Sequence, residues 1–176
     1  MRILMLNNEF PPLGGGTGSV NQALFQEFSK VPDLHIDLVT SALRRHFERE
    51  WFSERIRILK VPVNNKNIHH SSGRELAQYS AQALPKAIDL YRQNPYDVVL
   101  AWSIVPAGAV ALGLNMILRV PFMVRVSGPD IPGFERRYRW LYPCLTPLIK
   151  SCLRRGRYVI TKCEKEARMV QAVVPQ

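Results

Sequence analysis

The first nineteen residues constrain the fold of this chain more than any other segment. Arg2–Leu6 is a short, almost continuous apolar run, as expected for a strand buried on both faces of a parallel sheet. A Pro-Pro bend and three consecutive glycines come next, and then an amphipathic stretch, Gly18–Lys30. This order of strand, glycine loop and helix predicts the first turn of a Rossmann-like sheet. Backbone N–H groups at the start of such a helix suit an anion or a sugar-phosphate.

Length and composition indicate one globular domain spanning residues 1–176. The most apolar run, Val105 to Leu118, is shorter than the ~18 residues that a membrane span needs. The N-terminus lacks a basic region followed by an apolar core, so we expect no secretory signal. Three cysteines without a Cys-x-x-Cys pair predict reduced thiols in a cytoplasmic protein.

Apolar periodicity predicts strands and helices that alternate along the chain. The expected strands are Arg2–Leu6, His35–Thr40, Arg55–Val63, Asp97–Trp102, Pro121–Val126 and Arg157–Thr161. The expected helices are Gly18–Lys30 with a buried stripe of Val20, Leu24 and Phe28, Arg74–Gln93 kinked at Pro85, Ala107–Leu118, a mixed region Glu135–Arg154 bent at Pro143 and Pro147, and Glu164–Val173. Arg44–Glu54 reads as a charged, irregular link and Asn64–Gly73 as a loop. The expected fold class is therefore α/β, with a Rossmann-like, mostly parallel sheet and helices on both faces.

Ligands of such sheets bind at the carboxyl ends of the strands. Four loops leave the expected strands there: Asn7–Gly18, Trp102–Pro106, Ser127–Phe134 and Lys162–Glu164. We expect the binding residues in these four loops.

The glycine loop does not fit the two best-known phosphate-binding fingerprints. A dinucleotide site needs Gly-x-Gly-x-x-Gly directly after the first strand, whereas Ser19 takes the place of the third glycine and about seven residues separate Leu6 from Gly14. The second strand ends in Thr40, so no acidic residue is present to bind a ribose hydroxyl. A P-loop needs Gly-Lys-Ser/Thr, and this loop has no lysine. On composition alone the glycines could also be a flexible turn.

Four segments, in order along the chain, carry a more specific pattern. They are Asn-Glu-Phe-Pro-Pro-Leu-Gly-Gly-Gly at residues 8–16, Tyr-Asp-Val-Val-Leu-Ala-Trp-Ser at 96–103, Pro-Phe-Met-Val-Arg-Val-Ser-Gly-Pro-Asp at 121–130 and Arg-Tyr-Val-Ile-Thr-Lys-Cys-Glu at 157–164. Together they resemble the N-terminal domain of family 4 glycosyltransferases of the GT-B type. Each motif alone is weak, but the four cover nearly the whole chain.

The resemblance implies one half of a two-domain enzyme. In this family the N-terminal domain holds a sugar or lipid-linked acceptor, and a C-terminal domain holds a nucleotide-sugar (UDP- or GDP-sugar) through a Glu-x7-Glu segment that residues 1–176 lack. It implies transfer with retention at the anomeric carbon, without a metal cofactor, and a fragment that is inactive by itself. The sequence agrees on the metal, since His69-His70 has no further ligand at suitable spacing and reads as a solvated pair.

The resemblance also suggests roles for individual residues. Gly14, Gly15 and Gly16, with Thr17, match the loop that approaches the donor phosphates. Asp130 falls on the aspartate of the family's His-Gly-x-Asp segment, with Ser127 in place of the histidine and Gly128 on its glycine, so the resemblance makes Asp130 and Ser127 the catalytic candidates. Asp130 could equally cap the following turn. Either Ser127 or Arg125 partly substitutes for that histidine, or the acceptor chemistry differs from that of the family. Glu9, Trp102 and Ser103 are acceptor-side candidates, and Trp102 could equally be a core residue.

The net charge of +10 is concentrated towards the C-terminus. Between Arg119 and Arg168 there are twelve Lys/Arg against four Asp/Glu. Arg136, Arg137, Arg139 and Trp140 combine basic and aromatic side chains, which favours contact with an anionic membrane at its inner face; an ordinary amphipathic helix packed on the sheet is the alternative. A basic nucleic-acid-binding module and a free-standing Rossmann-like regulatory domain are the competing functions. We expect no nucleic-acid partner, because no groove-reading motif accompanies the charge.

Overall fold

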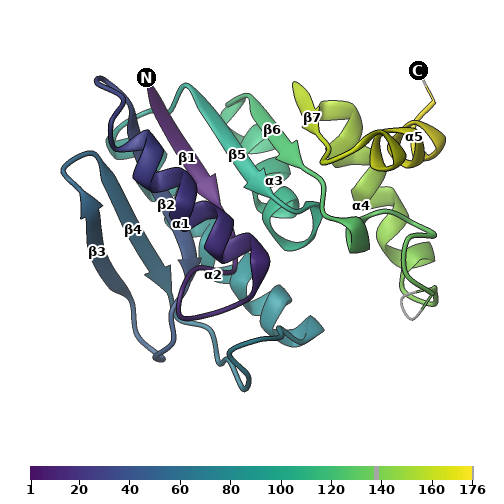
Figure 1. Cartoon of the computed structure of the whole chain (residues 1–176), viewed down its shortest axis with the longest axis horizontal. Coiled ribbons are helices and arrows are strands. Elements are labelled where there is room, and N and C mark those ends of the chain that lie inside the picture. Colours follow the sequence, from purple (N-terminus) through teal and green to yellow (C-terminus); the bar gives the residue numbers. More distant parts are fainter. Residues whose placement is uncertain (137–138, 176) are drawn as a thin grey trace.

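The computed structural model describes residues 1–136 and 139–175, and it forms a seven-stranded α/β sheet (Figure 1). The strands are β1 (Arg2–Leu6), β2 (His35–Ser41), β3 (Glu48–Ser53), β4 (Ile56–Val61), β5 (Val98–Trp102), β6 (Phe122–Arg125) and β7 (Tyr158–Ile160). The helices are α1 (Gly16–Phe28), α2 (Gly73–Gln93), α3 (Ala109–Leu118), α4 (Tyr142–Arg155) and α5 (Glu164–Val173), with short helical turns η1 (Ile104–Gly108) and η2 (Gly128–Asp130).

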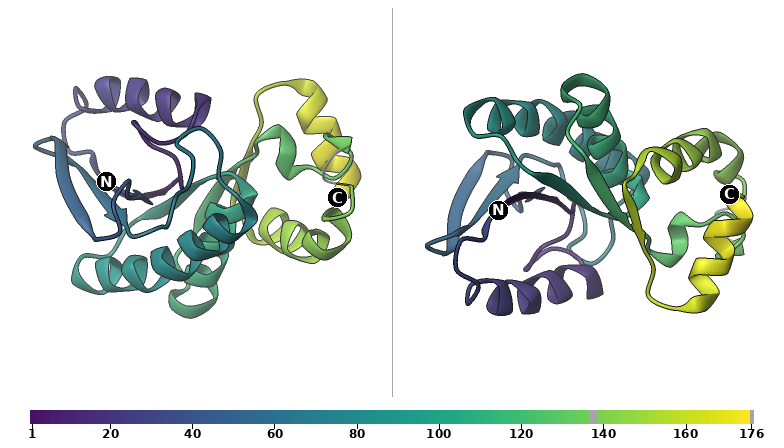
Figure 2. Two further views of the ribbon diagram at one scale, coloured as in Figure 1. Left: turned by 90° about the horizontal axis from the view of Figure 1, so that it is seen from below. Right: turned by 90° about the horizontal axis from the view of Figure 1, so that it is seen from above.

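The strand order is β3-β4-β2-β1-β5-β6-β7, and every pair is parallel except β3 with β4. Figure 2 shows α1 on one face of the sheet and α2, α3 and α4 on the other. The predicted α/β class, parallel sheet and two-sided helix cover are thus confirmed. Because the connections are crossovers, the carboxyl ends of β1, β5, β6 and β7 meet along one edge of the sheet.

Two apolar clusters hold the helices on the sheet. The larger one joins α2, α3 and α4 to the strands through side chains such as Tyr79, Leu114, Phe122 and Ile149. The smaller one lies under α1 and centres on Phe25, whose ring is 5.6 Å from that of Phe10 and 5.5 Å from that of Phe52.

The predicted buried stripe of α1 is wrong at Val20, whereas Leu24 and Phe28 are partly buried against the smaller apolar cluster. Val20 is 44% exposed, and the buried residues of this helix are Gly18, Asn21 and Phe25. Gly18 faces the loop closely enough that an added Cβ would lie 3.3 Å from the Phe10 backbone. The tight Pro-Pro turn presses this part of the helix against the loop, so a glycine occupies the inner face and the apolar Val20 turns outward.

The expected irregular link Arg44–Glu54 is also wrong, because its second half forms β3. All six residues of β3 are exposed or half-buried, so the apolar alternation that marks a strand is missing. The strand is held instead by antiparallel pairing with β4, by the 2.8 Å ion pair between Lys60 and Glu50, and by Arg57 over the Trp51 ring at 5.8 Å.

The mixed helical region resolves into one helix that begins late. α4 starts at Tyr142, with Pro143 in its first turn, where a missing N–H costs nothing, and Pro147 lies inside it without ending it. The helix α2 contains Pro85 and begins with a capping box in which Ser72 accepts the N–H of Glu75 and the Glu75 carboxylate accepts the N–H of Ser72. None of the helices among the described residues is long and apolar enough to cross a membrane.

Candidate functional site

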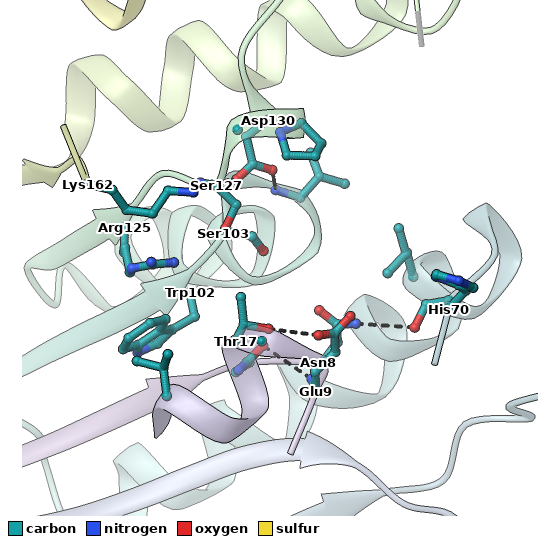
Figure 3. Close-up of a pocket in the computed structure, with 18 of the residues that line it drawn as sticks. Asn8, Glu9, Thr17, His70, Trp102, Ser103, Arg125, Ser127, Asp130 and Lys162 are labelled. Atoms are coloured by element: carbon teal, nitrogen blue, oxygen red, sulfur yellow. Dashed lines mark hydrogen bonds between the residues drawn. The ribbon is translucent and has the colours of Figure 1, made fainter. Parts of the chain in front are cut away.

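A pocket of about 610 Å³ opens at the carboxyl edge of the sheet (Figure 3). Its walls come from the loop after β1, the first turn of α1, the loop before α2, the ends of β5 and β6, η2, and the segment after β7. The lining includes Asn7, Asn8, Glu9, Gly16, Thr17, Val20, His69, His70, Ser71, Trp102, Ser103, Arg125, Ser127, Gly128, Asp130 and Lys162. Residues as far apart in the chain as Asn7 and Lys162 thus converge at the edge where this class of sheet binds ligands.

Most of the residues singled out from the sequence lie in this pocket. Nine line it: Glu9, Gly16, Thr17, Trp102, Ser103, Arg125, Ser127, Gly128 and Asp130. Gly14 and Gly15 do not line it, and Arg136, Arg139 and Trp140 lie elsewhere, before α4. Arg137 lies outside the described residues.

The Glu9 carboxylate covers the start of α1. Its Oε2 atom accepts the Thr17 hydroxyl at 2.7 Å and the Gly15 N–H at 3.3 Å (Figure 3 shows the Thr17 bond). The first turn of α1 has no acidic residue of its own, so Glu9 supplies the negative charge that a helix N-terminus favours.

Gly14 shapes the loop without facing the pocket. Its φ of +88° is a conformation that residues with a Cβ rarely adopt, and an added Cβ would lie 2.4 Å from the Glu9 Cβ. Its N–H donates to the Ile68 carbonyl at 2.6 Å, which ties the loop to the segment before α2. Gly14 therefore allows Glu9 to reach the helix, and only Gly16 of the three glycines borders the cavity.

Asp130 is buried and joins two loops. Its carboxylate accepts three backbone N–H groups, from Ile104 at 3.0 Å, Val105 at 3.2 Å and Ser127 at 2.9 Å. Burial raises the pKa of Asp130 from its usual 3.8 to about 6, although the three N–H donors oppose this shift. Both oxygens are engaged with backbone N–H groups that precede Asp130 in the chain, and not with the following turn that the sequence left as an alternative.

Ser103 has a strained backbone at the floor of the pocket. Its φ of 103° lies in the region that residues other than glycine avoid. The strained conformation is held from both sides, since the Ser103 N–H donates to the Arg125 carbonyl and the Ser103 carbonyl accepts the Gly108 N–H, each at 2.9 Å. Strain of this kind collects at functional sites, which supports a role for this pocket.

Trp102 and Arg125 are stacked at the ends of neighbouring strands. The Arg125 guanidinium carbon is 4.5 Å from the centre of the Trp102 ring, and the two residues are paired in the β5–β6 ladder. Trp102 is 5% exposed and belongs to the apolar cluster under α1, so it is a core residue and a pocket wall at once.

Several lining residues carry no functional signal in the sequence alone. Asn8 donates to the Ser71 hydroxyl at 3.4 Å, and the loop before α2 brings His69 and His70 to the rim, where they were expected only as a solvated pair. Ser72 is followed three residues later by Glu75, and this capping-box spacing could have marked where the loop meets its helix. Among the described residues no group of three or more His, Cys, Asp or Glu side chains could hold a metal ion.

The basic, aromatic segment before α4 is open to solvent. Trp140 is 74% exposed and Phe134 is 43% exposed. The alternative expectation, an amphipathic helix packed on the sheet, fits α4 but not the segment before it. The buried residues of α4 are Tyr142, Ile149, Cys152 and Leu153.

Comparisons with known proteins bear on the fold. No protein-family model matches this sequence, and no curated protein sequence matches it. Among solved structures, the sucrose-phosphate synthase of Thermosynechococcus elongatus superposes with a TM-score of 0.71 at 13% identity, over 97% of this chain and 44% of that chain. The UDP-GlcNAc 2-epimerase of Neisseria meningitidis, bound to UDP-GlcNAc, superposes with a TM-score of 0.60 at 11% identity, over 98% of this chain and 43% of that chain.

A shorter form of the Thermosynechococcus synthase, which this chain covers to 81%, gives a TM-score of 0.69 at 12% identity. The chain therefore spans less than half of the two longer proteins and most of the shorter form. At these identities the likeness shows the fold alone. This chain therefore shares the Rossmann-like α/β fold of these structures.

Proposed function

We propose that this chain is the acceptor-side domain of a retaining glycosyltransferase of family 4. In this proposal it works with a nucleotide-sugar domain, which binds a UDP- or GDP-sugar, at the inner face of a membrane. The observation that carries the proposal is the convergence of nine sequence-selected residues in one pocket at the carboxyl edge of a GT-B-like sheet. The acceptor is a polysaccharide or a lipid-linked sugar.

The pocket has two sides with different chemistry. On one side Gly16 and Thr17 begin α1, where the donor phosphates take the place beside the Glu9 carboxylate, which already accepts the Gly15 N–H and the Thr17 hydroxyl. On the other side Ser103, Arg125 and Ser127 offer hydroxyl groups and a cation to the acceptor. Asp130 positions the walls between them through its three backbone contacts and does not itself exchange a proton with substrate.

The two glycines Gly16 and Gly73 provide a matched test. Each is the first residue of a helix, and a Cβ added at either one would meet nothing within 4 Å, so neither Ala variant should unfold the chain. Gly16 borders the pocket and Gly73 does not. We expect Gly16→Ala to weaken the binding of UDP-glucose or GDP-mannose, followed by saturation-transfer NMR, and Gly73→Ala to leave it unchanged. Equal binding by both variants would exclude the α1 end of the pocket as the donor side.

A second experiment tests for the proposed nucleotide-sugar domain. Reading the coding sequence downstream of the codon for Gln176 should reveal a second series of strands and helices with a Glu-x7-Glu segment. An immediate stop codon would contradict independent catalysis by a single chain and would favour a split-subunit or binding role.

A further inference from the structure

Two cationic side chains reach the acceptor side of the pocket from neighbouring strands. Arg125 ends β6, and Lys162 lies just after β7, which pairs with β6 in parallel so that Arg125 lies opposite Ile160. Both residues line the pocket, and Figure 3 shows their side chains close together on the same wall as Ser127.

Arg125 is not committed to an ion pair within the described part of the chain. The interaction its side chain makes is the stacking on Trp102, which fixes the plane of the guanidinium but satisfies none of its N–H donors. By contrast, Arg57 binds both oxygens of Asp37, at 2.8 and 2.7 Å. The guanidinium nitrogens of Arg125 are not among the buried polar atoms without a partner, so they stay open to the pocket, oriented and available to a ligand.

Lys162 contributes a second, more mobile charge. Its ammonium lies 3.2 Å from the carboxylate of Glu166, which is buried and also accepts the Lys162 backbone N–H at 2.9 Å. The side chain is 52% exposed, so it keeps donors free towards the pocket.

Unpaired donors also border the same cavity. The Asn7 amide oxygen accepts the Glu9 N–H, which leaves the Asn7 Nδ2 group without a partner among the described residues. The Trp102 Nε1 group has none either, and both residues are more than nine-tenths buried. The acidic side chains of the pocket are already engaged, Glu9 with the glycine loop and Asp130 with backbone. The Ser103 and Ser127 hydroxyls are unpaired as well among the described residues and can donate or accept, so the charges of Arg125 and Lys162, rather than a surplus of donors, favour an anionic ligand.

We propose that Arg125 and Lys162 bind a phosphoryl group of the acceptor, so that the substrate that receives the sugar is a phosphate ester. This inference rests on the proposed function and narrows its acceptor class. The fork of the guanidinium matches two phosphate oxygens, and the ammonium neutralises the remaining charge. The donor diphosphate is a second source of the same chemistry, but in the proposed function it belongs at the other side of the pocket, beside Gly16.

The indole N–H of Trp102 is a built-in reporter for this site. The chain has three tryptophans, and each gives one indole resonance in a ¹H–¹⁵N spectrum. Trp102 lies under Arg125, whereas Trp51 is on β3 and Trp140 precedes α4, both outside the pocket. Titration of the 176-residue chain with glycerol 3-phosphate, at constant ionic strength, should shift the Trp102 signal and leave the other two in place. Glycerol and chloride at the same concentrations should have no such effect.

Variants identify the groups that bind. Arg125→Gln should weaken glycerol 3-phosphate binding by about tenfold or more, because it removes a charged hydrogen-bonding group from a phosphate. Lys162→Gln should weaken it less, because this side chain is half exposed. The matched control is Arg157→Gln, since Arg157 also lies over an aromatic ring, that of Tyr158 at 6.0 Å, but outside this pocket. Unchanged dispersion of the amide resonances establishes that each variant is folded.

The same titration with UDP separates the two phosphate sources and the two proposals. If Arg125→Gln impairs glycerol 3-phosphate binding but not UDP binding, the acceptor phosphate site is supported. If Arg125→Gln impairs UDP binding alone, the pair serves the donor and the inference is overturned, while the proposed function stands. If glycerol 3-phosphate shifts all three indole signals equally, or shifts none, the inference is overturned as well. The Gly16→Ala comparison with UDP-glucose tests the proposed function independently.

Discussion

The Oδ2 atom of Asp130 lies 3.0 Å from the backbone nitrogen of Ile104, across 26 residues of chain. Ile104 comes directly after Ser103, the residue with the strained φ of 103°. The carboxylate therefore ties η2 to the turn after β5 and over-determines the strained conformation that faces the pocket.

The stability contributed by Asp130 should depend on pH. Its folded pKa of about 6 lies above the unfolded value near 3.8, so the folded chain binds more protons between these values. The contribution is present in full below pH 4 and is lost as the pH rises through 6. We expect the free energy of unfolding of the wild type, relative to Asp130→Asn, to fall by roughly 2 kcal/mol between pH 4 and pH 7. Urea denaturation at several pH values measures this; a difference that is flat or rises with pH would contradict the prediction.

Gly14→Ala should disrupt the glycine loop. Alanine at a φ of +88° costs roughly 1–2 kcal/mol, and its Cβ would clash with Glu9, 2.4 Å away. We therefore expect a loss of at least about 2 kcal/mol in the free energy of unfolding. Gly16→Ala is the control, because nothing lies within 4 Å of its Cβ. Equal stability of the two variants would show that the loop relaxes freely.

The charge network around Asp37 should contribute more to the free energy of unfolding than a surface ion pair does. Asp37 accepts both arms of Arg57 and the Tyr96 hydroxyl, and it is 5% exposed. Asp37→Ala leaves a half-buried guanidinium unpaired, which costs up to about 3–5 kcal/mol. Glu27→Ala removes an exposed pair with Lys30 and should cost less than about 1 kcal/mol. Chemical denaturation of both variants, under one set of conditions, measures the two losses in free energy of unfolding and shows whether that of Asp37→Ala is larger.

The three cysteines should differ in reactivity. Burial raises the pKa of Cys152 to about 12, so this thiol is neutral at pH 8 and inaccessible. Cys144 and Cys163 are exposed. A thiol-specific reagent should therefore label two groups quickly in the native chain and three in denaturant. Rapid labelling of Cys152 would show that α4 opens readily from the sheet.

The exposed segment before α4 should bind anionic membranes. Arg136, Arg139 and Trp140 place charge and an indole together, with Trp140 74% exposed. We expect the chain to co-sediment with vesicles that contain phosphatidylglycerol. High salt should reduce this binding, because the Debye screening length falls to a few ångström. Trp140→Ala should weaken binding, and Trp51→Ala, at a 61% exposed tryptophan on β3, should not. Equal partition onto neutral vesicles at high salt would contradict this prediction.

The sequence by itself determined most of the sheet and the edge at which the pocket lies. Buried parallel strands are continuous apolar runs, so β1 and β5 stand out, whereas β2 shows Ile36 and Leu38 alternating with polar residues. Loops rich in glycine or proline follow β1 and β6 at their carboxyl ends. This is why Glu9, Ser103 and Asp130 could be selected before their contacts were known.

Only the tertiary structure decided the features that depend on neighbours distant in sequence. β3 is a strand because β4 offers it hydrogen bonds, and not because of its own apolar pattern. The inner face of α1 is set by the close approach of the loop to Gly18, which turns Val20 outward. Asp130 binds backbone groups 25 and 26 residues away, so these contacts became visible only when β5 and β6 lay side by side. Packing and hydrogen bonding between such segments act through space, and a local sequence pattern carries no record of them.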